Sequence, residues 1–220
     1  MEQSTRIQKE EIPFAQLEKA GVNKEFVNRM EPQELRDFLN GYRSEKLYTI
    51  NARINEQEYR IPVKLRLQKQ DDGSVQVKVH PIQRLHIPEN FMDHKFTEAE
   101  RNALLADRNL GKVVELQGKD GKKDQYYLSV DAKTNELIPL RARFIKVPES
   151  IKGAGLSEEQ RQKLAAGKKV FVEKMTGRNG KKFGASLQVD AATRSIGFSG
   201  FKVEKEQKQT RVKGSRQKVS

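Results

Sequence analysis

Two stretches of this chain have similar sequences, and their agreement decides the fold. Residues 175–198 read MTGRNGKKFGASLQVDAATRSIGF, and residues 118–140 read GKDGKKDQYYLSVDAKTNELIPL. In both stretches the glycine of a turn dipeptide lies nine residues before a Val-Asp pair, and a threonine follows three residues after the aspartate. The matching intervals predict an internal repeat, and we name the earlier copy repeat 1 and the later copy repeat 2.

Each repeat has a turn dipeptide between two predicted strands. Asp120-Gly121 and Asn179-Gly180 favour tight hairpins in which both central residues take positive φ. The returning strand alternates apolar and polar residues, and a third short strand follows it. Each copy is therefore expected to contain a three-stranded meander.

A capping box precedes each meander. Thr97 with Glu100, and Ser157 with Gln160, are spaced so that the two side chains satisfy free amides in the first turn of a helix. Each helix is expected to end at a glycine, because glycine takes the left-handed C-terminal cap conformation at little steric cost. These glycines are Gly111 and Gly167.

In the sequence before the repeats, the spacing of apolar residues changes once, from the period of helices to the period of strands. EIPFAQLEKAGV and PQELRDFLNGY have the apolar spacing of short helices, whereas LYTINARI, EYRIPVKLRLQ and SVQVKVHPI alternate as strands do. HPIQRLHIPENFMDHKF has no sustained period and is interpreted as a connector. The predicted fold class is α+β: a small N-terminal helical segment, an antiparallel β-meander, two helix-plus-three-stranded-meander repeats and a disordered basic C-terminal tail. The corresponding boundaries are 1–46, 47–95, 96–145, 150–200 and 201–220.

Composition limits the classes of protein that fit. Of 220 residues, 35% are hydrophobic and 33% are charged, which indicates thin cores divided among small units. Cysteine is absent, which excludes thiolate metal sites and fits a reducing compartment. No apolar stretch has the length of a signal peptide core or a membrane span, so we expect a cytoplasmic protein without a membrane partner.

The positive charge is concentrated near the C-terminus. The net charge is +13, and residues 146–220 carry 18 Lys and Arg against 7 Asp and Glu. Because a local excess of one sign creates a local potential, this segment is expected to attract polyanions.

No constellation of residues points to catalysis. His80, His86 and His94 lie five or more residues apart in irregular sequence, which is not the spacing of a usual metal site. TGRNGKK lacks both the spacing of a P-loop and its following serine or threonine. We therefore expect a protein that is not an enzyme, with no catalytic residues, bound metal or cofactor.

The candidate phosphate-binding residues lie in repeat 2 and the tail. Residues 174–182 contain four cations and no acid, whereas repeat 1 interleaves Asp120 and Asp124 among its lysines. Cations beside a glycine-containing turn suit phosphate contacts. The candidates are Lys174, Arg178, Lys181, Lys182, Lys202, Lys205, Lys208, Arg211, Lys213, Arg216 and Lys218.

Two aromatic residues of repeat 2 have two interpretations. Phe171 and Phe183 could stack on bases, as aromatic residues do in single-strand binders. Packing against the helix is the favoured interpretation for both. Gly184, Ser186 and Gln188 form a face of small or polar side chains on the returning strand.

The repeat also resembles a known family. Residues 156–198, LSEEQRQKLAAGKKVFVEKMTGRNGKKFGASLQVDAATRSIGF, resemble an uncharacterised domain family common in Bacteroidota, often carried by conjugative transposons and sometimes associated with topoisomerase-like proteins. EEIPFAQLEKAGV, with residues 134–160, resembles the companion domain usually found upstream. Lys174 and the basic tail depart from the family pattern. The resemblance implies a setting in mobile DNA and transfers no catalytic residue.

Two functions remain after these exclusions. The first is a non-catalytic nucleic-acid-binding accessory protein of a mobile genetic element, which contacts DNA or RNA phosphates without sequence specificity through repeat 2 and the tail. The second is a protein–protein adaptor or anti-defence protein of the phage-like kind, whose helical N-terminus holds a protein partner and whose tail only aids solubility.

Overall fold

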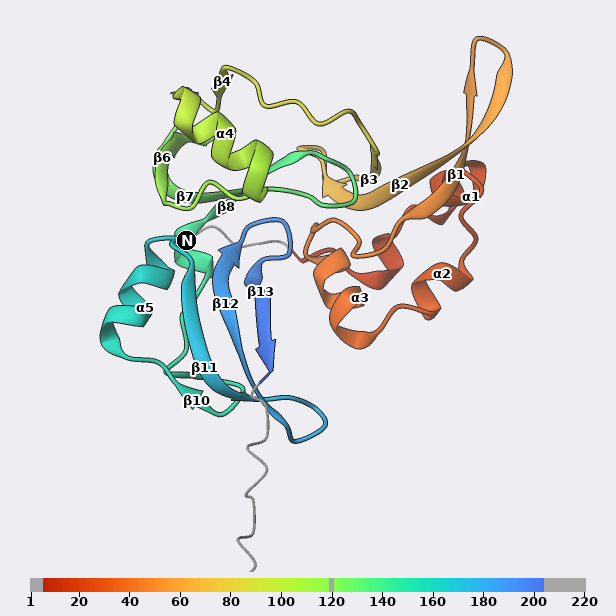
Figure 1. The fold of residues 1–220 in the computed structure, drawn as a ribbon. Helices are drawn as coiled ribbons and strands as arrows, with labels where there is room; N and C mark the ends of the chain where they lie inside the picture. The colour runs from red at the N-terminus through yellow and green to blue at the C-terminus, as the bar shows by residue number, and fades with distance from the viewer. Residues whose placement is uncertain (1–5, 119–120, 204–220) are drawn as a thin grey trace, which may run out of the picture. The chain divides into compact units, whose positions relative to one another are not determined.

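The structure is a computed structural model that describes residues 6–118 and 121–203 (Figure 1). The chain has the predicted α+β class, with short helices and several small antiparallel sheets. It divides into two compact units, which are described separately. Unit 1 contains residues up to Ile145 together with Asp190–Ser195, and unit 2 contains Lys146–Val189 and the chain from Ile196 onward.

Unit 1 begins with short helices packed on a β-meander. Leu17 and Phe38 are fully buried from the helical side, against Leu65 and Leu67 of the central strand. The helical segment and the meander thus form as the sequence predicts. The elements are η1 (Lys9–Glu11), α1 (Phe14–Lys19), α2 (Glu25–Asn28), α3 (Pro32–Leu39), β1 (Tyr48–Ile54), β2 (Gln57–Lys69) and β3 (Val75–Pro81).

Each repeat opens on a small hairpin that the sequence analysis missed. β4 (Asn90–Phe91) pairs with β5 (His94–Lys95) in repeat 1, and β9 (Ser150–Ile151) pairs with β10 (Ala154–Gly155) in repeat 2. The interpretation of residues 80–96 as a connector was therefore wrong for residues 90–95, whereas residues 82–88 have no regular secondary structure. Strands of two residues are too short to show a period, so the sequence gives no periodic signal for them.

The same backbone hydrogen bond closes both hairpins. The Phe96 amide donates to the Glu89 carbonyl at 2.9 Å, and the Leu156 amide donates to the Glu149 carbonyl at 2.7 Å. The matching positions lie 60 residues apart. The structural repeat therefore starts near residues 88 and 148, earlier than its helix.

Both capping boxes form as predicted, and the helix ends differ. α4 (Glu98–Asp107) and α5 (Glu158–Ala165) have reciprocal bonds between their cap and third residues. Gly167 follows α5 with φ +82, as expected of a C-terminal cap. α4 instead ends at Arg108, itself left-handed with φ 54, so the prediction that Gly111 ends this helix was wrong.

Each helix is followed by the predicted meander. Repeat 1 has β6 (Val114–Gln117), β7 (Lys123–Val130), β8 (Leu137–Arg141) and η2 (Ala142–Phe144). Repeat 2 has β11 (Val170–Thr176), β12 (Lys182–Asp190) and β13 (Ser195–Val203). Leu104 and Leu128 centre one apolar cluster, and Leu164 and Leu187 centre another. Each copy therefore has its own small core.

The hairpin turns are wider than their dipeptides suggest. The Gly180 amide donates to the Gly177 carbonyl at 3.0 Å, and the Gly177 amide donates to the Lys181 carbonyl at 2.9 Å. Gly180 has φ 76, whereas Asn179 is not left-handed, so the prediction of two positive φ values was wrong. Repeat 1 has the same two bonds around Gly118 and Gly121.

Repeat 2 has one extra residue in its first long strand. Val172 pairs with Ala185 and Met175 pairs with Phe183, so two residues of β11 face one residue of β12. Lys174 lies in this β-bulge with φ 59, a left-handed conformation that is uncommon for a residue other than glycine. The residue that departs from the family pattern is therefore the site of the bulge.

Candidate nucleic-acid interface

The four turn cations of repeat 2 lie on or beside one hairpin of unit 2. Lys174 occupies the bulge of β11, Arg178 and Lys181 lie in the turn, and Lys182 begins β12. All four side chains are exposed, and none forms an ion pair with another residue in the described part of the chain. Their charges are therefore available to a ligand. We call these four residues the hairpin cations.

One further lysine lies at the base of this hairpin. The Thr176 amide donates to the Lys152 carbonyl at 2.8 Å, and the Lys182 ammonium donates to Thr176 Oγ1 at 2.8 Å. Lys152 is exposed at the tip of the β9–β10 hairpin with φ 49. Sequence reasoning missed Lys152, because the small hairpin that carries it has no periodic signal.

The equivalent part of repeat 1 has its charges balanced. Lys123 pairs with Glu115 at 3.2 Å, and Asp124 lies 3.3 Å from Arg143. Asp93 occupies the tip position that Gly153 occupies in repeat 2. The structure therefore places acids and bases together in one copy, whereas the hairpin of the other carries bases alone over residues 174–182, next to the exposed Glu173.

The sheet of repeat 2 has an open face on the side opposite α5. Phe171 lies on this face, 36% exposed, so the prediction that it packs in the core was wrong. A Cβ atom on Gly184 would come within 2.7 Å of Phe171 Cζ, which shows that the ring lies across this glycine. The Lys202 ammonium lies 5.1 Å from the centre of the same ring. Glu173 is an exposed acid on the same strand.

The other aromatic residue follows the favoured interpretation. Phe183 is partly buried and packs against the apolar cluster of repeat 2. Its ring centroid lies 5.8 Å from that of Phe201. Phe171 is therefore the candidate for stacking on a base.

Of the tail candidates, Lys202 lies within the described residues and on this surface. Lys202 is exposed near the end of β13. The remaining candidates lie outside the described residues, as does the predicted disordered segment from residue 204 onward. They are Lys205, Lys208, Arg211, Lys213, Arg216 and Lys218. Residues 201–203 belong to β13, so the prediction of disorder was wrong for them.

The described residues hold neither a candidate metal site nor a membrane-spanning helix. Within residues 6–118 and 121–203, no group of three or more His, Asp or Glu side chains is arranged to hold a metal ion. His80 instead lies 3.0 Å from Glu136, and His94 lies 3.3 Å from Glu100. None of the helices described is both long and apolar enough to cross a membrane.

Comparison with known proteins identifies two segments. Residues 7–87 match the family model described as protein of unknown function (DUF4099), and residues 148–201 match the one described as protein of unknown function (DUF3945). No curated protein and no solved structure matches the chain. The first segment covers the helices and meander of unit 1, and the second covers repeat 2 from its small hairpin onward. The chain is thus similar to two uncharacterised domain families, one upstream of the other.

Proposed function

We propose that this protein is a non-catalytic nucleic-acid-binding accessory protein of a mobile genetic element. Repeat 2 contacts phosphates through the hairpin cations, and the C-terminal tail adds further phosphate contacts. Binding does not depend on base sequence, because the interface consists of charged side chains around a turn rather than groups aimed at base edges. The setting in mobile DNA rests on the family resemblance of the sequence.

The observation that carries the proposal is the unbalanced charge of the hairpin. Exposed lysines and arginines that already hold a carboxylate gain little from a phosphate, since the ion pair must first be broken. The hairpin cations hold no carboxylate among the described residues. The backbone of Lys152 joins the same hairpin at Thr176, and the Lys152 ammonium lies 5.6 Å from the centre of the Phe198 ring. Phosphate neutralisation supplies most of the free energy of sequence-independent binding.

The open face of the sheet extends this interface. Bases of a single strand stack on exposed aromatic rings, and this contact tolerates any sequence because every base has a flat face. Phe171 offers such a ring, and the Lys202 ammonium lies over it, 5.1 Å from the ring centre. In a duplex the base faces are already stacked, so the proposal favours single strands.

The experiment measures binding of fluorescently labelled DNA and RNA, single- and double-stranded, by anisotropy at low salt. The full chain is compared with a chain ending at Val203, which keeps β13 whole; an end at Gly200 would cut that strand. We expect both chains to bind, the shorter one more weakly, with affinity that falls as salt rises. Absence of binding at micromolar full-length protein and low salt would contradict the proposal and leave the adaptor function.

A further inference from the structure

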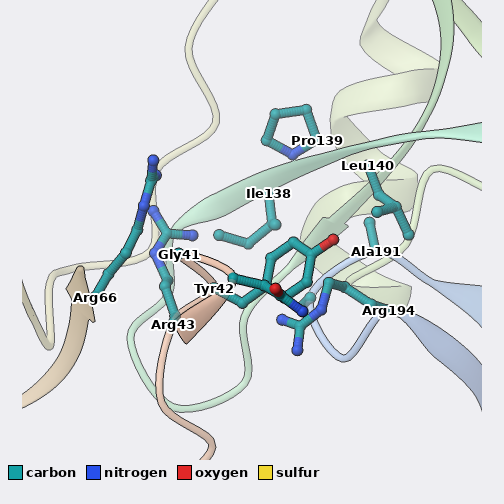
Figure 2. Close-up of a pocket in the computed structure, with 11 residues that line it drawn as sticks. Gly41, Tyr42, Arg43, Arg66, Ile138, Pro139, Leu140, Ala191 and Arg194 are labelled. Atoms are coloured by element: carbon teal, nitrogen blue, oxygen red, sulfur yellow. The ribbon is translucent and has the colours of Figure 1, made fainter. Parts of the chain in front are cut away.

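Unit 1 contains a cavity of about 370 Å³ that the proposed function does not use (Figure 2). This volume lies within the range of small-molecule sites, about 300–1,000 Å³. The cavity is formed by the chain after α3, the middle of β2, strand β8 and the turn 190–195. The lining residues that decide its chemistry are Tyr42, Arg43, Arg66, Ile138, Pro139 and Arg194.

One end of the cavity is cationic. Figure 2 shows the side chains of Arg43 and Arg66 next to each other at this end. Arg66 forms no ion pair with any described residue, and Arg43 shares Glu136, at 3.3 Å, with His80. The Nε atoms of both arginines are buried and have no hydrogen-bond partner within the described chain. Buried donors are normally satisfied, so these two indicate a missing acceptor.

The two guanidinium groups also disfavour each other. Burial lowers the pKa of Arg43, and the neighbouring charge of Arg66 lowers it further, against the opposing effect of Glu136. Asp131 also opposes the lowering of this pKa, but both carboxylates already have another partner, His80 for Glu136 and Lys64 for Asp131. An anion with two charges placed between them removes the repulsion and supplies acceptors for both.

The rest of the lining is mostly apolar and includes the aromatic ring of Tyr42 and the side chain of Arg194. The Arg194 guanidinium lies 3.9 Å from the centre of the Tyr42 ring and is held by Asp37 at 2.9 Å. In Figure 2 Ile138 and Pro139 lie on the other side of the Tyr42 ring from Arg194. This part of the cavity therefore suits a planar group that carries no charge of its own.

We propose that this cavity binds a nucleotide through its phosphate monoester. Arg43 and Arg66 hold the phosphate, since planar guanidinium groups match phosphate oxygens in pairs. The base or sugar lies against Tyr42 and Pro139. Two sources can supply this chemistry: a free mononucleotide, or the phosphorylated 5′ end of a strand. This site uses none of the hairpin cations. A result that contradicts the proposed function therefore leaves this inference untouched, and the reverse also holds.

The test titrates the full chain with AMP, adenosine and inorganic phosphate by calorimetry. AMP is expected to bind more tightly than either fragment, and Arg66→Gln is expected to weaken AMP binding by about tenfold or more, because a charged hydrogen bond is lost. Arg60→Gln is the matched control, an exposed arginine on the same strand, and is expected to change nothing. Unfolding temperatures show whether either variant has lost its fold.

Other outcomes overturn the inference. Equal affinity for AMP and adenosine, unchanged AMP binding by Arg66→Gln, or no binding of AMP at millimolar concentration each contradict it. Competition against AMP with a 5′-phosphorylated oligonucleotide and its 5′-hydroxyl counterpart separates the two sources. Selective competition by the phosphorylated form assigns the strand end, absence of competition by either form assigns the free nucleotide, and equal competition by both forms contradicts recognition of a monoester. Arg66→Gln is expected to keep binding of 5′-hydroxyl oligonucleotides, which depends on repeat 2.

Discussion

Phe171 lies across Gly184 on the open face of the repeat 2 sheet. The contact is so close that a methyl group on Gly184 would lie 2.7 Å from the ring. In repeat 1 the face that corresponds to this one is closed, since Tyr127 and Ser129 are buried there. The exposed ring is therefore a feature that distinguishes the second copy from the first, along with its unbalanced charge.

Replacing this ring tests whether bases stack on it. Phe171→Ala is expected to weaken binding of single-stranded DNA by about 1–3 kcal/mol, the usual value for one stacked base, and to leave duplex binding nearly unchanged. Anisotropy titrations with both kinds of DNA measure the difference. Phe144→Ala is the control, since Phe144 is an exposed aromatic residue of unit 1. Equal losses for single and double strands would show that the ring does not stack on bases.

A buried ion pair in unit 1 is expected to be costly to break, and the cost appears in the free energy of unfolding. The Lys64 ammonium lies 2.5 Å from Asp131, and their side chains are only 10% and 3% exposed. Asp131→Asn leaves a buried ammonium without a counter-charge, so the free energy of unfolding is expected to fall by about 3–5 kcal/mol. Urea unfolding at neutral pH measures the loss.

Repeat 2 supplies the matched control for this pair. Asp190 occupies the position of Asp131 and accepts the same kind of turn hydrogen bond, from the Ala192 amide at 2.9 Å, with no ion pair to any described residue. Asp190→Asn is expected to cost less than about 1 kcal/mol. If the two substitutions had equal effects, the Lys64 pair would contribute nothing beyond the turn.

Glu100 is expected to make the fold sensitive to acid at a position where repeat 2 has no carboxyl. Burial raises the pKa of Glu100, but hydrogen bonds from Thr97 and from the Lys112 ammonium outweigh it and lower the pKa to about 2 from 4.5. A carboxyl with a depressed pKa stabilises the fold above its unfolded pKa, and this contribution is lost as pH falls from about 4.5 towards 2. Gln160 holds the same position in repeat 2 and does not titrate.

The measurement compares wild type with Glu100→Gln by urea unfolding between pH 7 and pH 3. At neutral pH the wild-type chain is expected to have a larger free energy of unfolding than Glu100→Gln. This difference is expected to shrink as the pH falls below about 4.5. Lys112 and His94 both face this carboxylate, so Lys112→Gln provides a second variant that reduces the same difference. A difference that stayed constant with pH would contradict the assigned pKa.

Short-range signals predicted the repeats, because each depends on residues close in sequence. The capping boxes and turn glycines fix local hydrogen bonds, and these bonds form in both copies. Phe171 was placed on the wrong face because Val170, Phe171 and Val172 are all apolar, so alternation alone does not choose a face. The helix end at Arg108 was missed because a non-glycine residue takes the left-handed conformation there.

The candidate sites were predictable only in part. The hairpin cations are neighbours in sequence, and one hairpin keeps them together. Lys152 joins them through a backbone bond to Thr176 across more than twenty residues. The arginine cavity combines four separate segments of unit 1, so tertiary structure alone brings Arg43, Arg66 and Arg194 together.

The central claim is that the hairpin cations of repeat 2 hold phosphates and that their counterparts in repeat 1 do not. The most direct measurement compares two matched double variants, Lys181→Gln with Lys182→Gln and Lys122→Gln with Lys123→Gln, in the salt dependence of duplex DNA binding. The first pair is expected to weaken binding and to reduce the slope of log K against log salt by about 2, while the second pair keeps the wild-type slope. Equal slopes for the two double variants would contradict the claim.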